Sequence, residues 1–114
     1  MNAAPHQLED VWSDWKDAVT MTASQLETWL DSDESRSVGQ KDSAGGESVG
    51  HESGRRIVDI LRTRKAELTD DDVAHMRKVV GYVHRHLAQK PSKEDLETSK
   101  WRYSLMNWGH DPLN

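Results

Sequence analysis

The strongest constraint on the fold is a helix signal in the second half of the chain, "LTDDDVAHMRKVVGYVHRHLAQKP". Thr69 stands where an N-cap residue belongs, and Asp72, three residues later, completes a capping box. Acidic residues at the start and basic residues near the end suit the two poles of the helix dipole. Apolar residues recur at helical spacing along one side, and Pro91 ends the pattern. The sequence therefore predicts a long amphipathic helix over 70–89, whose two heptads favour a bundle helix over a coiled coil.

Shorter helix signals occur on both sides of this segment. The predicted helices cover residues 5–19, 23–31, 54–67 and 93–98, followed by a short C-terminal helix that carries Trp101, Leu105 and Trp108. Thr22 and Gln25 repeat the capping box before the second helix, and Ser53 is the expected cap of the third. Gly109 suits a left-handed C-cap after the last helix.

All five tryptophans lie on apolar stripes, and phenylalanine is absent. The tryptophans are therefore expected to supply the bulk of a small core, with one or two of them partly exposed. The alternative is that they form stacking or peptide-binding platforms.

One stretch of the chain is too polar to fold on its own. Residues 32–50 hold five serines and four glycines but few apolar side chains, so little burial would offset the entropy cost of ordering them. We expect a flexible, disordered insert there. The whole chain, 1–114, then forms a single all-α domain, a small bundle of five or six helices with 70–89 at its centre.

Composition excludes several classes of protein. The chain has no cysteine, so disulfide frameworks, thiolate metal sites and thiol nucleophiles are ruled out. No apolar run approaches the length of a membrane span, and the N-terminus lacks the pattern of a signal peptide. We expect a cytoplasmic protein that does not enter membranes.

Charge divides the chain into two unequal halves. Residues 1–50 hold three Lys or Arg against ten Asp or Glu, whereas residues 51–114 hold twelve against ten. An anionic partner should therefore meet the second half. The candidate contacts with a nucleic-acid backbone are its clustered cations, Arg55, Arg56, Arg62, Lys65, Lys78 and Arg85. Lys78, Tyr82 and Arg85 follow one helical stripe, so an aromatic ring would interleave with the cations. A solvated surface balanced by nearby acids is the competing interpretation.

The histidines fit no recognised ligand or catalytic spacing. His84 and His86 lie about 200° apart around a helix and cannot share a metal ion. His110 and Asp111 are sequence neighbours without an activated nucleophile. We therefore expect no metal, no cofactor, no catalytic residue and no small-molecule substrate.

Four stretches, "MTASQLETWL", "ESVGHESGRRIVDILRTRK", "LTDDDVAHMRKVVGYVHRHLAQKP" and "WRYSLMNWGHDP", together resemble a small family of uncharacterised bacterial and archaeal proteins. This family is a domain of unknown function, and some of its members are labelled DNA-binding. The resemblance implies DNA binding and brings no catalytic residues with it. The expected function is that of a small non-enzymatic DNA-binding protein. The alternative is a protein-interaction module that binds a second copy of itself or another protein.

Overall fold

The computed structural model describes residues 5–38, 49–92 and 95–113. In these residues the fold is all-α, as predicted, with six α-helices, two short 3-10 helices and no strand. The α-helices are α1 (Pro5–Ala18), α2 (Ala23–Leu30), α3 (Asp33–Arg36), α4 (Val49–Leu61), α5 (Asp70–Leu87) and α6 (Lys100–Asn107), and the 3-10 helices are η1 (Lys65–Glu67) and η2 (Leu96–Thr98).

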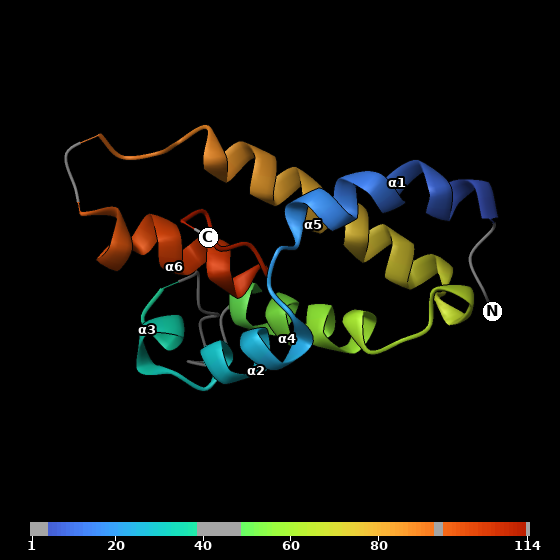
Figure 1. Ribbon diagram of the computed structural model, residues 1–114, viewed down its shortest axis with the longest axis horizontal. Helices are drawn as coiled ribbons and strands as arrows, with labels where there is room; N and C mark the ends of the chain where they lie inside the picture. Colours follow the sequence, from blue (N-terminus) through green and yellow to red (C-terminus); the bar gives the residue numbers. More distant parts are fainter. Residues whose placement is uncertain (1–4, 39–48, 93–94, 114) are drawn as a thin grey trace.

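The helices form two pairs joined by the C-terminal segment. α1 packs along α5 on one side of the molecule, and α2 packs along α4 on the other (Figure 1). α6 contacts α2, α3, α4 and α5, so it connects both pairs. No helix among the described residues is long and apolar enough to span a membrane.

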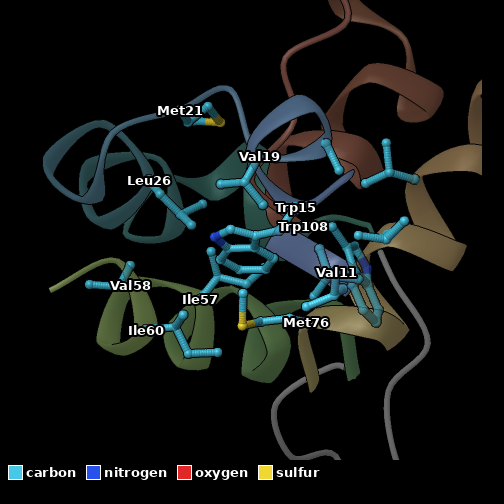
Figure 2. Packing of buried hydrophobic residues seen from close by; sticks show 14 of the residues in the cluster. Val11, Trp15, Val19, Met21, Leu26, Ile57, Val58, Ile60, Met76 and Trp108 are labelled. Carbon is cyan, nitrogen blue, oxygen red and sulfur yellow. The ribbon is translucent and has the colours of Figure 1, made fainter. Parts of the chain in front are cut away.

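The core lies where these elements meet. Figure 2 shows side chains from α1, α2, α4 and α5 packed around Trp15, Ile57 and Met76. Ile57 and Met76 are completely buried, and Trp15, Trp101 and Trp108 are nearly so. Trp12 and Trp29 are only partly buried at the edge of the cluster. The assignment of the tryptophans to the core, with two of them partly exposed, is confirmed.

Both predicted capping boxes are present. The hydroxyl of Thr69 accepts the amide of Asp72 at 3.1 Å, and the Asp72 carboxylate accepts the amide of Thr69 at 3.0 Å. Thr22 and Gln25 make the same reciprocal bonds at the start of α2. These local bonds satisfy amides that have no partner within the helix, which explains why α2 and α5 begin as predicted.

The chain after α6 closes the helix with a left-handed glycine, as predicted. Gly109 has a φ of +82°, and its amide donates to the carbonyl of Met106 at 2.9 Å. The amide of His110 donates to the carbonyl of Leu105 at 3.0 Å. The two bonds form a Schellman motif, which glycine adopts without steric strain.

Three boundaries differ from the sequence prediction. The helix expected over 54–67 begins instead at Val49 and ends at Leu61, and residues 65–67 form η1. Ser53 is therefore not a cap but a buried residue within α4. Of the helix expected over 93–98, residues 93–94 lie outside the described residues, and residues 96–98 form the 3-10 helix η2, which begins after Asp95.

The prediction of a disordered insert over 32–50 is wrong at both ends of that range. Residues 33–36 form α3, and residues 49–50 open α4. Ser35 is completely buried, and its hydroxyl is satisfied there because it donates to the side-chain oxygen of Asn107 at 2.5 Å. Polar burial of this kind carries no apolar pattern, so composition alone did not reveal it. The middle of the predicted insert, 39–48, lies outside the described residues.

Candidate nucleic-acid interface

Three of the six predicted cations bind carboxylates of other helices. The Nη2 atom of Arg56 on α4 lies 3.3 Å from a carboxylate oxygen of Asp72 on α5. The Nη1 atom of Arg62 lies 2.8 Å from a carboxylate oxygen of Glu27 on α2. Lys65 on η1 lies 3.1 Å from Glu9 on α1, and its ammonium also stands 4.4 Å above the ring of Trp12. For these three residues, the interpretation of a surface balanced by nearby acids is the one that the structure supports.

Arg55 faces a groove of mixed charge. It lines a hollow of about 510 Å³ between α2 and α4 together with Arg62, Glu27, Asp31 and Asp59. Carboxylates on both walls would repel a phosphate backbone at this groove. The structure therefore does not join the α4 cations into one positive face.

Lys78 and Arg85 have a different setting, because both are exposed on α5. From Val73 to Lys93 the sequence contains no aspartate or glutamate. Arg77 and His84 are also exposed on this helix. The surface formed by the exposed residues Arg77, Lys78, His84 and Arg85 around the half-buried Gly81 is called here the outward face of α5, and its charged side chains are of a single sign.

Three members of this surface, Arg77, Gly81 and His84, were not predicted from the sequence. A signal for them was present: in a helix, the nearest surface neighbours of Gly81 are the residues three and four positions away, namely 77, 78, 84 and 85. All four are basic or histidine. The cluster is recognised only when helical neighbours are counted from Gly81 rather than from the cations.

Contrary to the prediction, the ring of Tyr82 does not interleave with the cations. Its ring stacks on Trp108 with centroids 4.1 Å apart, and on His86 with centroids 5.0 Å apart. Burial raises the pKa of Tyr82, although a hydrogen bond from Ser104 and the charge of Arg85 act in the opposite direction. Tyr82 therefore belongs to the contact between α5 and the end of α6.

His75 extends the same contact toward α4. Its ring lies parallel to Trp108 at a centroid distance of 6.4 Å, and its Nε2 atom lies 2.9 Å from the hydroxyl oxygen of Ser53. Burial, followed by the charges of Arg56 and Lys78, lowers the pKa of His75 and so favours the neutral ring. The Ser53 side chain is buried, at 4% exposure for the residue, so a substrate has no access to this serine–histidine pair. We interpret the pair as a structural hydrogen bond.

A bidentate ion pair holds the C-terminal segment in place. The Nε and Nη2 atoms of Arg102 each donate to a carboxylate oxygen of Asp111 at 3.0 Å. Burial raises the pKa of Asp111, but the hydrogen bonds from Arg102 and from the Leu113 amide, together with the charges of Arg102 and His110, outweigh it and leave that pKa below its ordinary value. His110 bonds the carbonyl of Ala18 through Nδ1 at 2.7 Å. Arg102, His110 and Asp111 thus hold the end of the chain against α1 and α6.

No group of three or more potential metal ligands occurs in the described parts of the chain. The sequence matches a family model described as "Protein of unknown function (DUF3140)" over residues 14–106. No curated protein and no solved structure matches the chain.

Proposed function

The chain belongs to the DUF3140 family of proteins of unknown function, and from this premise we propose that it is a small non-enzymatic protein that binds DNA through the outward face of α5. The observation that carries the proposal is a group of exposed basic side chains on α5, within a stretch of sequence that holds no acidic residue, in a chain whose net charge is −5. Such a surface suits a phosphate backbone, because each neutralised phosphate releases condensed counterions.

Of the six cations predicted to contact DNA, the proposal retains two. Lys78 and Arg85 lie on the outward face of α5, whereas Arg56, Arg62 and Lys65 are engaged with carboxylates. Exposed ion pairs contribute only about 0–1 kcal/mol each, so these three cations are not locked in place. However, the carboxylate that remains beside each of them would oppose a phosphate.

The test is a pair of matched double variants. Lys78→Gln with Arg85→Gln removes two charges from the outward face, and Arg62→Gln with Lys65→Gln removes two charges from the ion-paired set. Fluorescence anisotropy with a short DNA duplex is measured over a series of salt concentrations. In a plot of log affinity against log salt concentration, the first variant should flatten the slope by about two units, since each phosphate contact contributes about 0.9.

The second variant should leave that slope unchanged. Circular dichroism checks that both variants remain folded. An equal loss in the two variants would restore the wider set of six cations. Absence of binding by the unmodified protein at low salt would refute the proposal.

The second candidate is the protein-interaction module, and one groove favours it. Met21, Trp29 and Met106 line a hollow of about 510 Å³ beside α2. Among the described residues, however, the one large apolar side chain classed as exposed is Leu113, at 45%. The apolar surface is therefore small beside the charged one. A mass that rises with concentration in sedimentation equilibrium, with no retention on DNA, would support this candidate.

A further inference from the structure

Three of the four described glycines lie at a close approach or a turn within the fold. A side chain at Gly54 would place its Cβ atom 2.6 Å from the carbonyl oxygen of Asn107. Gly109 has a positive φ that other residues rarely adopt. At Gly50 the added Cβ atom would lie 3.2 Å from the indole nitrogen of Trp108. Each of these glycines permits a close approach or a turn within the molecule.

Gly81 has no such role. It lies inside α5, and a Cβ atom built on it would meet only the tip of Arg85, with the Nη1 atom at 3.1 Å and Cζ at 3.9 Å. The end of an exposed arginine moves easily, so no fixed atom of the described structure occupies this space. A glycine within a helix destabilises it by about 1 kcal/mol relative to alanine. The residue therefore costs stability that no contact within the described structure explains.

The basic side chains are arranged around this glycine in two rows. Successive residues of an α-helix are about 100° apart, so Arg77 and His84 lie to one side of Gly81 while Lys78 and Arg85 lie to the other. Within each row the two residues are seven positions apart, which corresponds to about 10.5 Å along the helix axis. The middle of the outward face is thus the helix backbone itself, with basic side chains on both flanks.

We propose that α5 lies in the major groove of B-form DNA, with Gly81 toward the base edges and one row of basic side chains toward each phosphate backbone. This inference rests on the function proposed above. The major groove is about 12 Å wide and 8.5 Å deep and admits an α-helix. A missing side chain at the centre of the face lets the helix axis approach the groove floor. Each row spans about three nucleotides of one strand, at about 3.4 Å per nucleotide.

The same geometry selects against other polyanions. The major groove of A-form RNA is deep and too narrow for this approach, and a single strand has no groove. An acidic protein helix could meet the cations, but it has no need of two rows separated by a bare backbone. Double-stranded DNA is therefore the ligand that uses every feature of this face.

The first experiment adds bulk to the face without changing its charge. Gly81→Leu fills the open space, and Ala66→Leu adds the same side chain at an exposed position on η1. Anisotropy titrations with duplex DNA should show affinity reduced by about tenfold or more for Gly81→Leu, and unchanged for Ala66→Leu. Thermal unfolding verifies that both variants are folded.

A second measurement leaves the protein unmodified and blocks the groove instead. A duplex whose cytosines carry glucosyl groups in the major groove should bind less tightly than the plain duplex. Equal affinity for the two duplexes, or full duplex affinity in folded Gly81→Leu, would overturn the major-groove placement. These results leave salt-dependent binding by the unmodified protein intact, so they are distinct from failure of the proposed function. Tighter binding to an acidic helical peptide than to the duplex would also overturn the inference.

Discussion

Replacing Gly81 by alanine should stabilise the protein. Alanine is favoured over glycine inside a helix by about 1 kcal/mol, partly because glycine leaves the unfolded chain more freedom to lose. The new Cβ atom meets only the guanidinium of Arg85 at 3.1 Å, and shifting that exposed tip offsets a few tenths of a kcal/mol. The expected net gain in the free energy of unfolding is about 0.5–1 kcal/mol.

Urea denaturation followed by circular dichroism measures this gain. With a denaturant slope of about 1.5 kcal/mol per molar, the midpoint should rise by about 0.3–0.7 M. The slope itself should not change, because the folded surface is almost the same. The same substitution at Gly54 supplies the comparison of opposite sign: its Cβ atom would lie 2.6 Å from the Asn107 carbonyl oxygen and 2.7 Å from a methyl of Leu30, so the midpoint should fall.

A midpoint that stays the same or falls in Gly81→Ala would refute this reasoning. It would mean that the fold itself needs a glycine at this position. Gly81 would then serve the fold and would not indicate an external ligand. A gain in stability combined with weaker duplex binding would show that stability is sacrificed for contact with DNA.

Three further outcomes test the internal structure. Asn107→Ala leaves the indole N–H of Trp29 and the hydroxyl of Ser35 without their acceptor, so the free energy of unfolding should fall by about 2–4 kcal/mol in urea titrations; a loss within error would mean that water replaces the amide. Because burial and nearby cations lower the pKa of His75 in the folded protein, the free energy of unfolding should be highest above about pH 6.5. It should decrease as the pH falls from there toward the lowered pKa of the folded state. His75→Gln should flatten that decline, and an unchanged pH profile would exclude His75 as its source. Deletion of 101–114 removes buried core and should abolish the cooperative unfolding transition; a fully cooperative truncated protein would show that this segment is dispensable for folding.

Local chemistry made much of the fold predictable. The capping boxes of Thr22 and Thr69 use side chains within three residues of the amides that they satisfy. The left-handed cap at Gly109 depends on one residue type at one position. Signals of this kind are complete within a short stretch of sequence, so the starts of α2 and α5 and the end of α6 follow directly from it.

Other features depend on partners far along the chain. Ser35 is ordered by Asn107, seventy-two residues away, and Arg62 is neutralised by Glu27, thirty-five residues away. Tyr82 turns toward Trp108 rather than toward solvent because α6 packs beside it. Which of the predicted cations bind carboxylates of other helices likewise follows from tertiary packing, so helical periodicity alone overestimated the basic face.

The charge on α5 is not explained by helix stability alone. The dipole favours cations in the last turn, which accounts for Arg85, but the effect fades within one turn and does not reach Arg77 or Lys78. A surface selected for stability would place acidic residues four positions from these cations, and α5 has none there. At a net charge of −5, the molecule as a whole repels DNA, so the proposed function requires that attraction come from this one face in one orientation. Binding should therefore depend steeply on Lys78 and Arg85 and hardly at all on cations of α4 that face carboxylates.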